Sequence, residues 1–168
     1  MAGGEAAPTF DWTSAKEELM KQVLIATDGS PSAQEAVDVG LELAKEQGAD
    51  VTFVHVTEPD EFRAGRVGTV PIAHREEIDE SEAALNAAAE AAEAAGVSYA
   101  LERIAGETVD TIVALADAKN ADLIVLGNRG RNAVTSALLG SVSHGVLRQA
   151  SRPVLVVKAA KAPAGTAV

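Results

Sequence analysis

Five short apolar runs, separated by longer stretches of helical periodicity, constrain the fold more than any other feature of this sequence. Strands that alternate with helices form a parallel sheet through right-handed crossovers, with helices covering both faces. Covered strands are apolar along their whole length, as these runs are. The sequence therefore predicts a single α/β domain with a doubly wound, five-stranded parallel sheet. The predicted strands are Val23–Thr27, Val51–Val56, Ser98–Ile104, Leu123–Leu126 and Pro153–Val157.

Four helices are predicted between these strands. The first begins at Ser30 and Pro31, since serine caps helices and proline favours the first turn. The second spans Glu76–Ala95 by its alanine and glutamate content, and Gly96 follows where a C-terminal glycine belongs. Apolar residues at helical spacing predict the buried faces of the others: Ala33, Ala36, Val37, Gly40, Leu41 and Ala44 in the first helix, Val109, Ile112, Val113 and Ala116 in the third, and Leu139, Val142, Val146 and Leu147 in the fourth.

The remaining segments are expected to lie outside this framework. Residues 1–20 form an N-terminal extension, 21–158 the domain and 159–168 a flexible C-terminal tail. Pro59–Arg75 is expected to form a mobile loop over the ligand-binding edge of the sheet, and Ser14–Gln22 is a candidate short helix. In doubly wound sheets ligands bind beyond the carboxyl ends of the strands, so the loops after the first, second and fourth strands are the places to search for a site.

Composition excludes several classes of protein. The chain has no cysteine, which excludes a disulfide framework, a thiol nucleophile and a cysteine-ligated metal site. Its apolar stretches of five or six residues are too short to span a membrane, and its first residues do not resemble a signal peptide. We therefore expect a cytoplasmic protein. A net charge of −11 works against binding to nucleic acids or anionic membranes.

The charge is distributed unevenly. All 25 acidic residues lie at or before Asp122, whereas residues 123–168 hold six basic residues and no acid. Two of these basic residues, Arg129 and Arg131, lie directly after the fourth strand. An anion site is therefore expected in this last quarter, unless the basic residues serve solubility or balance an acidic face.

A glycine-rich loop follows the fourth strand, in the segment GNRGRNAVTSALLGSVS. Gly127 is expected to let a ligand approach the strand end, and Gly130 to form the turn without a Cβ clash. Gly140 and Ser141 then present the unpaired N–H groups of the fourth helix to a phosphate, with the serine hydroxyl as a cap or a phosphate donor. The alternative is a turn that only connects strand to helix, with Ser141 as an ordinary N-cap. The loop is neither a P-loop nor the dinucleotide fingerprint G-x-G-x-x-G.

Three segments resemble the universal stress protein family: the opening VLIATDGSPSAQEAV, the pair His55–Val56, and the block GNRGRNAVTSALLGSVSHGVLRQASRPVLVV. The resemblance extends from Val23 to Lys158 and includes the motif G-x2-G-x9-G-[ST] of the ATP-binding branch. It implies a Rossmann-like sheet in the order 3-2-1-4-5, binding of ATP or another adenine nucleotide with Mg²⁺, and a homodimer through the fifth strand at Val154, Leu155, Val156 and Val157. An edge protected by the C-terminal tail is the alternative to this dimer.

The resemblance also implies the residues of a nucleotide site. Asp28, with Ala26 and Thr27, would contact the nucleoside, and Val56 would lie against adenine. Asp28 is also a candidate ligand of Mg²⁺, although an Asx turn or a helix cap would explain it equally well. The glycine loop completes the site: Gly127 and Gly130 along the ribose and phosphate path, Gly140, Ser141 and Val142 at the phosphates, Ser143 close by, and Arg129 as a source of positive charge.

No catalytic constellation is evident. His55 lies in an apolar strand and is interpreted as a core histidine, while His74 and His144 have no acidic partner at a suitable spacing. The acidic residues in Glu76–Glu82 are interpreted as a solvated helix face.

The leading hypothesis is a cytoplasmic, ATP-binding stress-response protein that acts as a nucleotide-regulated dimer. Hydrolysis of ATP would be slow or absent, because no general base is evident. Two alternatives are an ATP-using enzyme of the same superfamily, whose Ser-Gly-Gly, His-x-Gly-His and Lys-Met-Ser-Lys signatures are absent, and a partner-binding module that uses no nucleotide.

Overall fold

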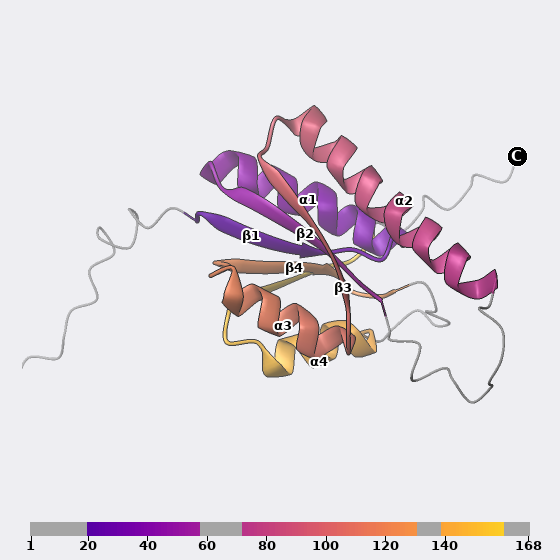
Figure 1. Cartoon of the computed structure of the whole chain (residues 1–168). Helices are drawn as coiled ribbons and strands as arrows, with labels where there is room; N and C mark the ends of the chain where they lie inside the picture. Colours follow the sequence, from indigo (N-terminus) through magenta and orange to yellow (C-terminus); the bar gives the residue numbers. More distant parts are fainter. Residues whose placement is uncertain (1–19, 58–71, 131–138, 160–168) are drawn as a thin grey trace, which may run out of the picture.

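The computed structural model describes residues 20–57, 72–130 and 139–159. They form a five-stranded parallel sheet in the order β3-β2-β1-β4-β5, with helices on both faces (Figure 1). The predicted α/β class, strand number and strand order are confirmed. In chain order the elements are β1 (Gln22–Ala26), α1 (Pro31–Gln47), β2 (Asp50–Thr57), α2 (Ile72–Ala95), β3 (Tyr99–Ala105), α3 (Thr108–Ala118), β4 (Leu123–Gly127), α4 (Ser141–Gln149) and β5 (Val154–Val157).

The sheet separates two hydrophobic clusters. Side chains of α1 and α2 pack on one face, while α3 and α4 pack on the other (Figure 1). Neighbouring strand residues alternate between the clusters, so Val23 and Ile25 join the first and Leu24 the second, each with no exposed surface. This two-sided burial is why the strands read as continuous apolar runs.

Helix α1 follows its sequence signals. Ser30 is the N-cap, and its hydroxyl accepts a hydrogen bond from the Ala33 N–H at 3.2 Å. All six residues of the predicted apolar face are buried. The helix ends at Gly48, whose φ of 69° places it in the left-handed region that favours glycine.

Helix α2 begins earlier than predicted. Its first residue is Ile72, so residues 72–75 belong to the helix and not to the expected loop. Pro71 precedes them in the sequence, and proline is compatible with a helix start but not with its interior. The predicted end at Ala95 is confirmed, and Gly96 has a φ of 70°.

The fourth helix is shorter than predicted. It begins at Ser141, so Leu139 precedes it and is 41% exposed, while Leu147 is 46% exposed. The prediction that both leucines lie on the buried face was wrong. The buried residues of α4 are Ser143 and Val146, with Val142 partly buried beside them, and Gly145 lies close to Val109 where α4 packs against α3.

Other expectations fall on the margins of the described residues. Gln22 begins a strand, so the predicted helix Ser14–Gln22 is wrong at that residue, and residues 14–19 of it lie outside the description. The remainder of the expected loop at 58–71, residues 1–19 and residues 160–168 also lie outside it. Within the described segments, no helix combines the length and apolar character needed to cross a membrane.

Candidate functional site

A cavity of about 520 Å³ opens at the carboxyl ends of β1, β2 and β4. This is the edge of the sheet at which the sequence predicted a ligand. All the predicted nucleotide-site residues line this one cavity: Ala26, Thr27, Asp28, Val56, Gly127, Arg129, Gly130, Gly140, Ser141, Val142 and Ser143. The sequence analysis did not assign six further lining residues to a site: Ala33, Val54, His55, Thr108, Ile112 and Leu126. Five of these six residues belong to no sequence motif that indicates a binding site. The sixth, His55, is 9% exposed and was interpreted as a core histidine.

The turn after β1 brings Asp28 to the cavity. The Thr27 N–H continues the sheet by donating to the Val54 carbonyl at 3.0 Å. The chain then turns through Gly29, whose φ is 75°, and Asp28 Oδ1 accepts a hydrogen bond from the Ser30 N–H at 3.0 Å. The carboxylate therefore forms the Asx-type turn considered as an alternative, and it lines the cavity as well.

The glycines at 127 and 130 permit close contacts within the protein. A Cβ on Gly127 would lie 2.6 Å from Ser32 Oγ and 2.7 Å from the Ser32 carbonyl carbon. A Cβ on Gly130 would lie 2.7 Å from Asp28 Oδ2. The space that the sequence analysis reserved for a ligand at Gly127 is therefore taken up by the first turn of α1. The two glycines let β4 and its loop pack against α1 and the β1 turn.

The start of α4 faces the same cavity. Its N-cap is Gly140, not Ser141 as the sequence suggested, and among the described residues no side-chain hydrogen bond caps the helix. Ser141 and Val142, the first two helical residues, line the cavity. The first N–H groups of a helix lack intrahelical acceptors and carry the positive end of the helix dipole. This helix end is thus suited to an anion.

Ser143 has a different position from Ser141. Its side chain is 2% exposed, and its Oγ lies 3.0 Å from the Gly140 carbonyl oxygen and 3.2 Å from that of Asn128. A hydroxyl has one proton to donate. Ser143 therefore uses its proton inside the loop, which leaves Ser141 as the exposed serine of this helix start.

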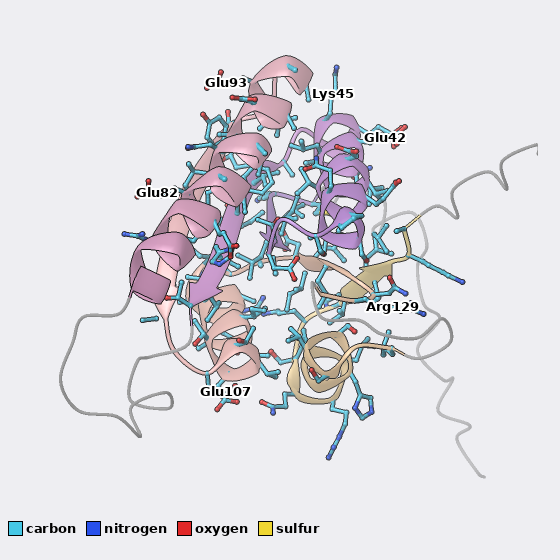
Figure 2. The ribbon with its side chains drawn as sticks, turned by 90° about the vertical axis from the view of Figure 1, so that its right-hand side faces the viewer. Glu42, Lys45, Glu82, Glu93, Glu107 and Arg129 are labelled. Atoms are coloured by element: carbon cyan, nitrogen blue, oxygen red, sulfur yellow. The ribbon has the colours of Figure 1, made fainter. Side chains whose placement is uncertain are left out.

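Arg129 brings positive charge to the cavity. Figure 2 shows it at the sheet edge between the ribbons of α1 and α4. Its Nε is shielded from solvent and has no hydrogen-bond partner in the part of the chain that the structure describes. A shielded donor without an acceptor is costly, so an anion at this point would stabilise the site. Arg131 lies outside the described residues.

The Universal stress protein family has a sequence model that matches residues 20–158, which is most of the chain. This chain belongs to that family. A universal stress protein of Methanocaldococcus jannaschii is 37% identical over 150 residues, and the match covers 86% of each protein.

Solved structures of universal stress proteins superpose on this chain. One, in complex with cAMP, has a TM-score of 0.64 and 30% identity, and the match covers 85% of this chain and 100% of that one. Another, from Archaeoglobus fulgidus in complex with dAMP, has a TM-score of 0.62 and 26% identity, with coverage of 83% and 98%. Adenine nucleotides are thus bound by structural neighbours within the family.

The cavity of this universal stress protein has chemistry that fits such a ligand. Its lining includes the apolar side chains of Val56, Ile112 and Leu126, here called the apolar wall, and the start of α4 with Arg129, here called the cationic end. Among the described residues, no three His, Asp or Glu side chains gather into a metal cluster. One carboxylate, that of Asp28, lines the cavity, which fits a Mg²⁺ ion carried mainly by nucleotide phosphates.

Two outer residues of the cavity edge were missed by the sequence analysis. Ser32 and Asn128 do not line the cavity, yet the Ser32 hydroxyl donates a hydrogen bond to Asn128 Oδ1 at 2.8 Å. Because the two residues are 96 positions apart in the sequence, no local pattern indicates that they are in contact. The interpretation of the acidic residues of α2 as a solvated face is confirmed at Glu80 and Glu82, which are exposed, while the side chains of residues 72–79 are not described.

Proposed function

We propose that this universal stress protein binds an adenine nucleotide in the cavity and acts as a nucleotide-regulated homodimer in the cytoplasmic stress response. ATP, accompanied by Mg²⁺, is the ligand that we assign to the site. One observation carries the proposal: the open N-terminus of α4 and an apolar wall face the same cavity of about 520 Å³. Nucleotides combine a flat apolar base with phosphates, and this arrangement matches both parts.

The two ends of the cavity suggest how the nucleotide is oriented. We place the base against Val56 and Ile112, with Asp28 near the ribose. The phosphates then reach the N–H groups of Ser141 and Val142, where the helix dipole and Arg129 favour negative charge. The complexes of two family members with cAMP and dAMP support the choice of adenine.

The Asp28 carboxylate is the group that we assign to Mg²⁺. The ion would lower the charge of the triphosphate where it approaches this carboxylate. Asp28 Oδ1 accepts the Ser30 N–H, which holds the carboxylate in place in the lining of the cavity, and carboxylate oxygens are suitable ligands for this ion. We expect hydrolysis to be slow or absent, because no side chain is assigned as a base that orients water.

Acid extraction of the purified protein tests nucleotide binding. Near-stoichiometric adenine nucleotide should be released from the parent protein and little from a Gly140→Asp variant, whose carboxylate would repel phosphate at the start of α4. Ala94→Asp adds the same charge at an exposed position of α2, away from the cavity, and should release as much as the parent. If the parent carries no nucleotide and added Mg·ATP leaves its melting temperature unchanged, a partner-binding module replaces this proposal.

We assign the dimer interface to β5, which is an edge strand. The carbonyls of Pro153 and Val157 accept hydrogen bonds from Ile124 and Asn128, on the β4 side. Because backbone groups alternate along a strand, those of Val154 and Val156 point away from β4. An exposed strand edge of this kind favours pairing with a second copy.

Light scattering on Val156→Pro tests the interface. Proline removes an outward N–H and is tolerated on edge strands, so the variant should keep its circular dichroism spectrum and become monomeric. A parent protein that is monomeric at all concentrations, or a dimeric variant, would refute the assignment to β5.

A further inference from the structure

Two side chains behind the cavity wall hold its cationic end together. The Ser32 hydroxyl donates to Asn128 Oδ1 at 2.8 Å and lies 3.4 Å from the Arg129 N–H, which donates to it. Ser32 is 6% exposed and comes from the first turn of α1. Neither Ser32 nor Asn128 lines the cavity, so neither is positioned to contact a ligand directly.

The backbone of Asn128 connects this pair to two more elements. Its N–H donates to the Val157 carbonyl at the end of β5, at 2.7 Å. Its carbonyl accepts the Gly140 N–H at 2.8 Å and lies 3.2 Å from Ser143 Oγ. The residue before α4 and a residue in its first turn are therefore anchored on Asn128, which is itself held by Ser32.

We propose that the Ser32–Asn128 pair positions the phosphate-binding end of the cavity and leaves the nucleoside end unaffected. The proposal rests on the proposed nucleotide site and adds positioning residues to it. The hydrogen bonds of the pair lead to Arg129, Gly140 and α4. Within the part of the chain that the structure describes, no hydrogen bond of the pair leads to the apolar wall at Val56 and Ile112, which belongs to β2 and α3.

The proposal predicts a difference between two ligands in the Ser32→Ala variant. Adenosine, which has no phosphate, should bind with the affinity of the parent protein. AMP should bind about tenfold more weakly, because one lost hydrogen bond corresponds to a factor of this order. Isothermal titration, or competition with a fluorescent adenine nucleotide for weak ligands, gives both constants.

Ser151→Ala is the matched control. The Ser151 hydroxyl also donates to a side-chain oxygen, that of Asp117 at 2.9 Å, but at an exposed site away from the cavity. It should leave both affinities unchanged. An equal loss of adenosine and AMP binding in Ser32→Ala would indicate general destabilisation, and an unchanged AMP affinity would indicate no role in binding. Either result overturns the proposal.

A double-mutant cycle tests whether the two residues act as a pair. Ser32→Ala, Asn128→Ala and their combination are compared by AMP affinity. If the residues act through their mutual hydrogen bond, the double variant should lose no more affinity than the weaker-binding single variant. Additive losses would show that they act separately and would refute a positioning pair.

Amide exchange in the ligand-free protein separates this proposal from the proposed function. The Gly140 N–H should exchange faster in Ser32→Ala than in the parent, whereas the Lys119 N–H, bonded to the Leu115 carbonyl in α3, should not change. If the parent binds neither adenosine nor AMP, the nucleotide site is refuted, and faster exchange still supports the role of the pair in the loop. Unchanged exchange at Gly140 refutes the pair, whatever the parent binds.

Discussion

The helices α1 and α4 begin at the same edge of the sheet, beside the same cavity, but their first turns are finished differently. The N-cap of α1 is Ser30, with φ −68° and ψ 158°, and its hydroxyl accepts the Ala33 N–H. The N-cap of α4 is Gly140, with almost the same backbone angles of −65° and 160°, and no side-chain cap is present in the described segments. The two N-caps thus have nearly the same backbone geometry. The first turn of α1 has a side-chain acceptor at its N-cap, and the first turn of α4 has none.

This difference indicates where a ligand anion belongs. Helix α3 is also closed by the protein, since the Glu107 carboxylate, labelled in Figure 2, accepts the Asp110 N–H at 2.8 Å. At α4 the N-cap glycine has no side chain to accept from the N–H groups of the first turn, so these groups are open to an acceptor from outside the chain.

The largest effect is expected where α1 meets the glycine loop. Gly127→Ala would place a Cβ within 2.8 Å of Ser32 backbone atoms, which cannot rotate away. We expect the free energy of unfolding to fall by about 3 kcal/mol, as measured by urea denaturation. Gly40→Ala is the comparison, because its Cβ would meet the buried Ile25 side chain and not backbone atoms, and alanine favours a helix interior, so its loss should be smaller. An equal loss in both variants would contradict the assigned role of Gly127.

Adding a side-chain cap to α4 would remove the difference between the two helix ends. In Gly140→Ser the backbone angles already suit a serine cap, and the new hydroxyl would accept an N–H group of the first turn. AMP affinity should fall about tenfold, because the ligand loses a donor, while the melting temperature of the ligand-free protein should fall only slightly, because the new Cβ would lie 3.1 Å from the Asn128 carbonyl oxygen. Calorimetric titration and a thermal scan measure the two quantities. Unchanged affinity would mean that the α4 terminus does not bind phosphate.

The reverse experiment removes the side-chain cap of α1. Ser30→Ala removes the acceptor for the Ala33 N–H, and the free energy of unfolding should fall by about 1 kcal/mol. Ser30→Gly should cost only a few tenths of a kcal/mol, since glycine is itself a tolerated N-cap. Denaturant titration of both variants decides the point. If Ser30→Ala is as stable as the parent, the two helix ends do not differ in the way described.

The smallest effect is expected at Asp122, which directly precedes β4 at the amino ends of the strands. There the anion is a carboxylate of the protein itself. Asp122 Oδ2 accepts the N–H groups of Lys21 and Gln22 at 2.7 and 3.0 Å, and these bonds hold its pKa below the ordinary value of 3.8. Its contribution to stability is therefore complete at neutral pH and is lost as the pH falls below 3.8 through the lowered folded-state pKa. Asp122 is exposed, so the effect should be roughly 0.5 kcal/mol.

Asp122→Asn measures this contribution. The variant should be less stable than the parent at neutral pH, and the difference should shrink as the solution is acidified. A difference in stability that stays constant down to acid pH would contradict the assignment to the ionised carboxylate.

Local signals were sufficient for most of the fold. In the described part of the chain, apolar runs predicted the five strands and helical spacing predicted α1, α3 and α4, because these periodicities reflect burial on one or both faces. Helix α2 was predicted from its alanine and glutamate content. The boundaries were less certain where no capping residue marks them: α2 begins at Ile72 and α4 only at Ser141. Leu139 and Leu147 were placed on a buried face because spacing alone does not reveal which stripe of a short helix is covered.

The sequence by itself determined the α/β pattern, the edge of the sheet at which the cavity opens and eleven of the residues that line it. These follow from periodicity, from glycine spacing and from the resemblance to a family. The tertiary structure alone decided which atoms fill the space beside Gly127 and which helix end stays open. Ser32 and Asn128 are 96 residues apart, and they meet because β1 and β4 pair in parallel and end side by side. Contacts of this kind depend on the packing of distant segments, which no local pattern encodes.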